Sequence, residues 1–389
     1  MKPQSRAISS RVRALHRAAP VVLGYVNPWL DYGAGTASAR RMFIQRRPWA
    51  QQSVPLLREG GVDVVVYSHG NNCPSHFSGA AEIEYMLRCF DALIAEAERH
   101  PHARILRTKG DLDRALREGK LGILLHLTGA PIHGDLAMLR TYQRVGVRAA
   151  HPFLRDPRVG GYCGGDPRVG LRPLGREILR EMERLGMVVD LAHANDRCFR
   201  DALRVATRPV IDSHTCCRAL VDVERNCADD QLRAIADTGG VVGAHFSSRF
   251  IAGSDGARAD LRAFRQKFLR EKVTELERRY KDPYEFLARR FDPNAWPKAL
   301  GGAVEDGTKI VRVSVGKLVD QIARMVDVAG VDHVGVGTDY DLGDICEIDR
   351  VDKLPVLTAE LVRRGFRPPE IRKILGENFL RVFRQCLPD

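Results

Sequence analysis

Short apolar runs alternate with longer amphipathic stretches along almost the whole chain. The runs are nearly continuous in Val, Ile and Leu, which is typical of parallel strands covered on both faces. The stretches between them repeat apolar residues at helical spacing, as in residues 82–100. The predicted strands cover residues 20–27, 62–70, 121–129, 147–153, 187–195, 209–217, 240–248 and 333–341.

Eight strands separated by helices predict a closed (β/α)8 barrel, the TIM barrel. An open doubly wound sheet is the alternative, but no GxGxxG motif follows the first run to support a dinucleotide site. We predict a basic tail over residues 1–19 and a single barrel over residues 20–389. A charged, mostly helical stretch at 252–312 breaks the rhythm, and we interpret it as an excursion over the mouth of the barrel.

The net charge of +12 raises the question of nucleic acid. The basic residues are interleaved with acids and no aromatic-rich basic stripe occurs, which indicates a basic solvated surface and no nucleic-acid partner. The N-terminus lacks a long apolar core, so neither a secretory signal nor a membrane anchor is expected. Nine cysteines without a CxxC pair suit a reducing compartment, and we expect a cytoplasmic protein.

Histidines gather where the predicted strands end, and Asp339 closes the eighth strand. Barrels collect catalytic groups at that face, because the βα loops open there. Core packing does not explain six such histidines, since each buried imidazole needs a hydrogen-bond partner. Imidazole and carboxylate are ligands that zinc takes in catalytic sites. The six are His69, His126, His151, His193, His214 and His245.

Several longer stretches carry a resemblance to a known family. They cover residues 180–195, 208–220, 223–246, 326–341 and 353–383. Together they resemble the membrane (renal) dipeptidase family of zinc metallopeptidases, over nearly the whole chain apart from the tail and the excursion. The resemblance implies a metal-dependent hydrolase barrel in which a binuclear zinc centre activates water against the amide bond of a dipeptide.

The resemblance also implies a role for individual residues. His193 and His214 match the two histidine ligands of one metal. His151 matches a histidine that faces the substrate and stabilises the tetrahedral intermediate. Arg225 matches the arginine that binds the substrate carboxylate, and Asp339 matches the acid/base that moves the proton.

Three positions depart from the family pattern. Tyr25 and Asn27 stand where a His-x-Asp pair is expected, and Thr128 stands where a metal-bridging glutamate is expected. Two dications would repel each other without these carboxylates, so we expect one metal per chain, zinc by preference. His126 points to the same face of its strand as Thr128 and is either a third ligand or a packed barrel histidine.

Other roles stay open between function and structure. Arg225 either binds a carboxylate or forms a salt bridge to the excursion, and Asp339 is an acid/base, a ligand or a helix cap. His245 is a ligand, a substrate contact or a structural residue. The first functional hypothesis is a hydrolase of a small dipeptide-like amide. The alternative is a barrel that has lost hydrolysis and binds or transforms a small metabolite; a homodimer is left open.

Overall fold

Parallel strands form the centre of the molecule. The computed structural model describes residues 8–27, 51–69, 80–129, 131–154, 156–253, 275, 278–279, 313–340 and 346–389. Eight strands follow the spatial order β6-β5-β4-β2-β1-β9-β8-β7, and β3 pairs with β4 outside this path. The strands are β1 (Val22–Val26), β2 (Val64–His69), β3 (Ala103–Ile105), β4 (Leu121–Thr128), β5 (Val147–His151), β6 (Val188–Val189), β7 (Ile211–Thr215), β8 (Val241–His245) and β9 (Val334–Gly337).

The two ends of this strand order meet beside β6. A parallel bridge joins Asp190 to Ile211, and the backbone N–H of Leu191 donates to the Ile211 carbonyl at 2.7 Å. Every other neighbouring pair in the order is also parallel. The predicted (β/α)8 barrel is therefore confirmed, with each of the eight predicted runs contributing one of its strands.

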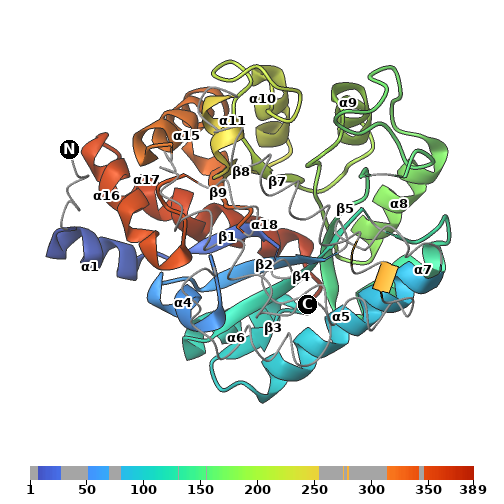
Figure 1. The fold of residues 1–389 in the computed structure, drawn as a ribbon, viewed down its shortest axis with the longest axis horizontal. Helices are drawn as coiled ribbons and strands as arrows, with labels where there is room; N and C mark the ends of the chain where they lie inside the picture. Colours follow the sequence, from blue (N-terminus) through green and yellow to red (C-terminus); the bar gives the residue numbers. More distant parts are fainter. Residues whose placement is uncertain are drawn as a thin grey trace.

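Helices surround the strands (Figure 1). Within the described ranges, every helix is too short or too polar to span a lipid bilayer. The helices are α1 (Ser10–Ala18), α4 (Val54–Glu59), α5 (Ala80–Arg99), α6 (Lys109–Glu118), α7 (Leu136–Val145), α8 (Pro173–Arg184), α9 (Asp196–Leu203), α10 (Asp229–Asp237), α11 (Ser248–Ala252), α15 (Val315–Ala329), α16 (Pro355–Arg363), α17 (Pro368–Arg372) and α18 (Asn378–Cys386), with the short turns η1 (Val331–His333), η2 (Val351–Lys353) and η3 (Lys373–Glu377).

Helix α1 lies within the segment that the sequence assigns to a basic tail. It packs beside α16, and its buried His16 joins Thr358 Oγ1 at 2.7 Å and the Gly60 carbonyl at 2.8 Å. These two bonds use both ring nitrogens, so the helix is attached to the outer layer of the barrel. Apart from residues 252, 253, 275, 278 and 279, the excursion at 252–312 lies outside the described residues.

The barrel interior changes from apolar to polar along the strands. At the end where the strands begin, Phe379 of α18 enters the interior against Gly24 and Gly335. A Cβ atom on either glycine would lie 2.4 Å from the Phe379 ring, so neither position has room for a side chain. The apolar cluster around Phe379 includes Val22, Val64, Val66, Leu124, Ala149, Val188, Ile211 and Val241.

Candidate active site

Five histidine rings form an arc at the carboxyl ends of the strands. Neighbouring ring centroids are 5.0, 5.0, 5.2 and 5.4 Å apart in the order His126, His151, His193, His214 and His245. The sequence-predicted convergence of these side chains on one face is thus present. His69 lies apart from the arc, with its ring edge-on to Phe90 on the outer side of β2.

Tyr25 of β1 lies inside the arc. Its ring stacks on His214 with a centroid distance of 3.9 Å and an interplanar angle of 16°. Its hydroxyl is 2.8 Å from Thr128 Oγ1 and 3.4 Å from His151 Nε2, and Thr128 Oγ1 is 3.1 Å from the same nitrogen. Burial, and next the negative charge of Asp339, raise the pKa of Tyr25, so its hydroxyl stays protonated.

A buried hydrogen-bond chain continues from Thr128 through Ser68 to His126. Ser68 Oγ contacts Thr128 Oγ1 and lies 2.7 Å from His126 Nδ1, while His126 Nε2 lies 3.1 Å from Asp190 Oδ2. Burial opposes ionisation of Asp190, but the His126 hydrogen bond and nearby histidines outweigh it and lower its pKa to about 2. His126 Nε2–H therefore donates to an ionised carboxylate, and both ring nitrogens of His126 are occupied.

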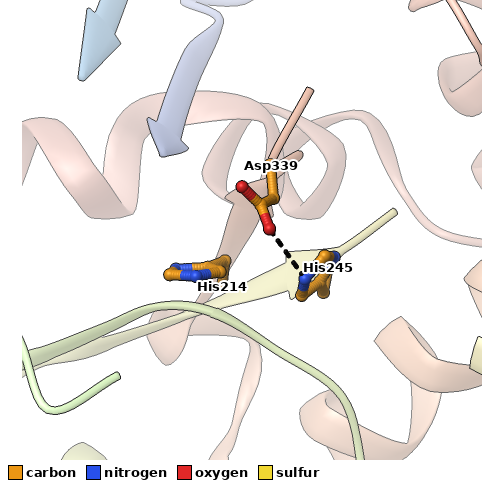
Figure 2. A group of neighbouring side chains, drawn as sticks. All are labelled: His214, His245 and Asp339. Carbon is orange, nitrogen blue, oxygen red and sulfur yellow. Dashed lines mark ion pairs between the residues drawn. The ribbon is translucent and has the colours of Figure 1, made fainter. Parts of the chain in front are cut away.

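A second network fixes Asp339. Asn27 Nδ2 donates to Asp339 Oδ1 at 2.9 Å. His245 Nε2 lies 3.2 Å from Asp339 Oδ2, the ion pair drawn in Figure 2. The backbone N–H of Ser247 donates to His245 Nδ1 at 3.0 Å, so the proton of the neutral ring lies on Nε2 and points at the carboxylate. Each oxygen of Asp339 thus accepts one hydrogen bond and keeps a further lone pair.

His214 and Asp339 are near enough to share an ion. One ligand atom from each of His214, His245 and Asp339 lies within 4.8 Å of the other two, and all three side chains are buried. His214 Nδ1 is 2.7 Å from Ser213 Oγ. With the proton on Nδ1 and donated to Ser213, Nε2 keeps a lone pair with which to bind a metal. This is the outer hydrogen bond that metal-binding histidines usually make.

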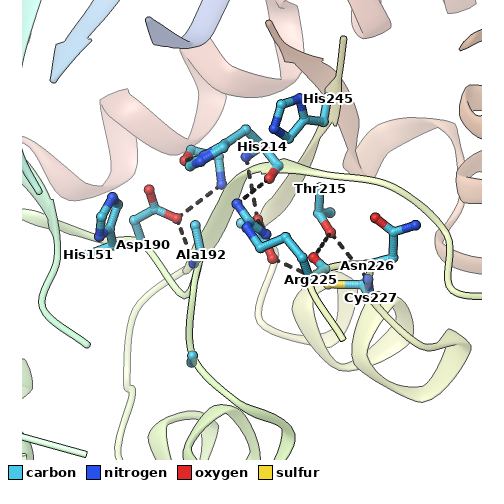
Figure 3. Close-up of polar contacts among 12 residues, drawn as sticks. His151, Asp190, Ala192, His214, Thr215, Arg225, Asn226, Cys227 and His245 are labelled. Atoms are coloured by element: carbon cyan, nitrogen blue, oxygen red, sulfur yellow. Dashed lines mark hydrogen bonds and ion pairs between the residues drawn. The ribbon is translucent and has the colours of Figure 1, made fainter. Parts of the chain in front are cut away.

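Arg225 lies beneath His214 (Figure 3). One terminal nitrogen donates to the His214 carbonyl at 2.5 Å, and the other lies 3.9 Å from Asp212 Oδ1. Burial raises the pKa of Asp212 to about 6, although Arg225 acts in the opposite direction. The side chain of Arg225 is 10% exposed, so its guanidinium supplies a fixed positive charge beside the histidine arc.

Burial keeps three histidines of the arc neutral, namely His151, His193 and His214. Burial, and next the charge of Arg225, lower the pKa of His193 and of His214 well below the ordinary value. Neutral imidazole is the form that binds metals. His193 and Asp339 also have positive φ angles, 68° and 51°, a conformation that is uncommon for residues with side chains and concentrates at functional sites.

We expect the free energy of unfolding to fall as pH drops from about 6.5 to 5. Burial lowers the pKa of His69 to about 4 and that of His151 to about 3, both from 6.5, so only the unfolded chain takes up these protons in this window. The cost approaches about 1.4 kcal/mol per pH unit for each such histidine. Denaturant unfolding at several pH values measures it. The change of unfolding free energy per pH unit should be smaller in His69→Gln than in the wild type, and unchanged in the exposed-site variant His102→Gln. Equal values in His69→Gln and the wild type would contradict the lowered pKa of His69.

The whole chain is similar in sequence to one family of known proteins. The sequence model described as membrane dipeptidase (peptidase family M19) matches residues 9–387. The chain belongs to the membrane dipeptidase family. An uncharacterized protein in the pqqA 5′ region of Klebsiella pneumoniae is 29% identical over 292 residues, covering 72% of this chain and 88% of that protein.

One further relative agrees with this membership, and a solved structure has the same fold. An uncharacterized dipeptidase of Schizosaccharomyces pombe is 30% identical over 282 residues, which cover 69% of this chain and 53% of that protein. The crystal structure of the probable dipeptidase PvdM from Pseudomonas aeruginosa has the same fold, with a TM-score of 0.75, 22% identity, and coverage of 98% of this chain and 99% of that one. Membrane dipeptidases are metal-dependent hydrolases. The question is therefore whether the side chains at the two metal positions of the family can bind a cation in this chain.

The position of the family's first metal does not suit a cation here. Tyr25 keeps its proton, Asn27 turns its amide N–H toward Asp339, and Thr128 is bound within the Ser68–His151 network. None of these three groups offers a negative charge. A dication at this point would have to displace several buried hydrogen bonds and gain no anionic ligand in return.

The position of the second metal does suit one divalent ion. Two imidazoles on one tetrahedral zinc place their ring centroids about 5 Å apart, and His193 and His214 are 5.2 Å apart. The carboxylate of Asp339 lies within 4.8 Å of a ring nitrogen of His214 and of His245, so His214 is common to this group and to the pair with His193. The third-ligand role predicted for His126 would require breaking its bond to Ser68 or to Asp190.

Sequence reasoning missed several polar residues of the site. Ser68, Asp190 and Ser213 each hold a histidine or its neighbours in place, and Asn27 was considered only as a lost ligand. A signal was present, because Ser68 interrupts the apolar run of β2 at an inward position. A polar residue inside a fully buried strand needs a buried partner.

Proposed function

We propose that this chain is a metal-dependent hydrolase that cleaves the amide bond of a small dipeptide-like substrate with one divalent ion, zinc by preference. His193, His214 and Asp339 would hold the ion. The observation that carries the proposal is the placement of His214: its ring lies beside that of His193, one of its ring nitrogens lies within 4.8 Å of the Asp339 carboxylate, and Ser213 Oγ holds its Nδ1 at 2.7 Å. Two histidines and a carboxylate form a ligand set that zinc hydrolases use.

A bound ion would supply a Lewis acid for the substrate carbonyl and lower the pKa of a coordinated water. The residues of the chain supply the rest. Asn27 and His245 orient the Asp339 carboxylate by one hydrogen bond to each oxygen. Ser213 fixes the ring of His214, and the stacked Tyr25 ring excludes water from one face of it. These fixed groups reduce the reorganisation needed during the reaction.

Substrate recognition is assigned to the positive charge of Arg225. Its side chain is buried beside His214 and partly neutralised by Asp212, whose pKa is raised. A substrate carboxylate would replace the weak 3.9 Å contact with a closer ion pair, which favours substrates with a free carboxyl end. His151 Nε2 is bonded to Thr128 and Tyr25, whereas its buried Nδ1 has no hydrogen-bond partner among the described residues, so Nδ1 is the nitrogen that could contact an intermediate.

The function is tested with a panel of unblocked dipeptides and N-acyl amino acids. The protein is stripped of metal and assayed after addition of zinc, manganese or iron(II). Metal-dependent release of amino acid supports the proposal, with a preference for substrates that have a free carboxylate. Absence of turnover with every metal and substrate, in protein that binds no metal, contradicts it.

Metal content provides a second prediction: at most one tightly bound divalent ion per chain. The reason is that Tyr25, Asn27 and Thr128 fill the first position with neutral, hydrogen-bonded groups. Elemental analysis by mass spectrometry on protein purified without chelator and then reloaded with zinc measures this stoichiometry. The contrary result would be two ions per chain that both stay bound during dialysis unless a chelator is added. It would show that the first position still binds metal.

One observation favours a second candidate, a barrel that binds or transforms a small metabolite without hydrolysis. At the first metal position, a continuous network runs from Asp190 through His126 and Ser68 to Thr128, and each of these side chains has a protein partner. The same panel separates the two functions. A barrel of this second kind would bind small carboxylates in calorimetry but release no product from any of them.

A further inference from the structure

The loop that follows β5 contains the same five-residue sequence twice, DPRVG at 156–160 and at 166–170. In each copy the aspartate accepts from the backbone N–H of the arginine two residues later and pairs with its guanidinium. The two turns are bonded to each other, from Gly161 N–H to the Gly170 carbonyl at 3.3 Å and from Arg172 N–H to the Val159 carbonyl at 3.0 Å. We refer to residues 156–172 as the double turn.

The double turn is paired with the backbone around His193. Cys163 N–H donates to the His193 carbonyl at 2.8 Å, and Asn195 N–H donates to the Gly161 carbonyl at 3.2 Å. An antiparallel bridge between Tyr162 and Ala194 lies between these bonds. His193 therefore has its left-handed φ of 68° within a short ladder formed with the double turn. A side-chain-bearing residue keeps such a conformation only where its surroundings determine it.

Asn195 connects the ladder to the rest of the fold. Its fully buried side chain donates from Nδ2 to the carbonyls of Asp166 and Val169, both at 3.1 Å, and accepts from Cys198 N–H at 2.8 Å. The last bond caps helix α9, and the first two hold the second turn. A Cβ on Gly161 would lie 2.2 Å from Asn195 Nδ2, so the close contact requires glycine there.

We infer that Asn195, through the double turn, is a positioning residue for His193. Its amide group links the second turn, the helix start and the strand end, and this arrangement fixes the backbone from which the His193 imidazole reaches toward His214. Residues around a metal site that orient its ligands change metal affinity without touching the ion. The inference rests on the proposed function, because it assigns His193 to the metal.

The test uses Asn195→Ser, which keeps an oxygen acceptor to cap α9 but removes the amide that binds Asp166 and Val169. The matched control is Thr108→Ala, which removes the distant cap of α6, where Thr108 Oγ1 accepts from Asp111 N–H. Cobalt(II) titration gives the dissociation constant, and the visible d–d absorption of bound cobalt reports its coordination geometry. We expect Asn195→Ser to raise the dissociation constant roughly 10- to 100-fold and to alter the spectrum, and the control to leave both unchanged.

Hydrogen exchange tests the same inference without metal. The backbone amides of Cys163 and Asn195 should exchange faster in Asn195→Ser than in the wild type, while the control leaves them protected. Wild-type cobalt affinity and spectrum in Asn195→Ser would overturn the inference. A wild-type chain that binds no cobalt would refute the proposed function. Hydrogen exchange then tests by itself whether Asn195 holds the backbone around His193. Unchanged protection of the Cys163 and Asn195 amides in Asn195→Ser would overturn the inference.

Discussion

Replacing His214 by alanine is expected to remove both the bound ion and the metal-dependent hydrolysis, with kcat/KM falling by more than about 100-fold. His214 is the residue that connects the proposed ligand set, since it lies beside the His193 ring and within 4.8 Å of the Asp339 carboxylate. Steady-state assays on the best dipeptide of the panel, together with metal analysis of the same preparation, measure the two losses.

Two further variants test whether the losses in His214→Ala come from removing a metal ligand. Ser213→Ala removes only the outer hydrogen bond to His214, so metal affinity should fall by about 10- to 100-fold while some activity remains at saturating metal. His102→Ala changes an exposed histidine and should behave as the wild type. Hydrolysis that survives in His214→Ala would contradict the assignment of the metal to this position.

Phe379→Ala should cost about 3–5 kcal/mol of unfolding free energy, the largest stability effect that we expect from a single truncation. The ring is fully buried inside the barrel, where it fills the space left by Gly24 and Gly335 and stacks near Phe383 at 5.8 Å. Its removal leaves a cavity that the barrel walls cannot close, because the strands are held by hydrogen bonds to both neighbours. Equilibrium unfolding in guanidinium chloride measures the change.

Phe366→Ala is the matched control, because this phenylalanine is only partly buried outside the barrel. Its truncation should cost distinctly less than that of Phe379. Phe379 packs in the apolar cluster of the barrel interior and not among the polar groups of the site, so metal content per folded chain should not change in Phe379→Ala. Equal costs at the two positions would show that the interior relaxes around the missing ring.

The barrel was predictable because each strand is a buried apolar run between helical stretches. β3 was not predicted, since its three residues, Ala103–Ile105, pair only with the first residues of β4 and contribute too short a pattern. Helix α1 was assigned to a tail because its turns are mostly polar. Its attachment depends on His16, whose partners Gly60 and Thr358 are remote in sequence and could not be inferred from local pattern.

The convergence of the site was also predictable, because parallel strands of a barrel end at one face. The hydrogen-bond partners were not. The pairing of Asn27 with Asp339 joins residues 312 positions apart, and the occupancy of both ring nitrogens of His126 depends on Ser68 and Asp190. Sequence spacing gives the face to which a side chain points, whereas the partner depends on strand order and register.

The bridge between Asp190 and Ile211 has a consequence for how such a protein can change over evolutionary time. Asp190 Oδ1 accepts from the backbone N–H groups of Ala192 and Ser213, each at 3.0 Å, so one carboxylate ties the end of β6 to β7 at the seam of the barrel. A descendant that lost His193, His214 and Asp339 would still require Asp190 to close its fold. Acidic groups that are retained around such a seam therefore reflect the needs of the fold. Retention of the catalytic activity must be judged from the metal ligands alone.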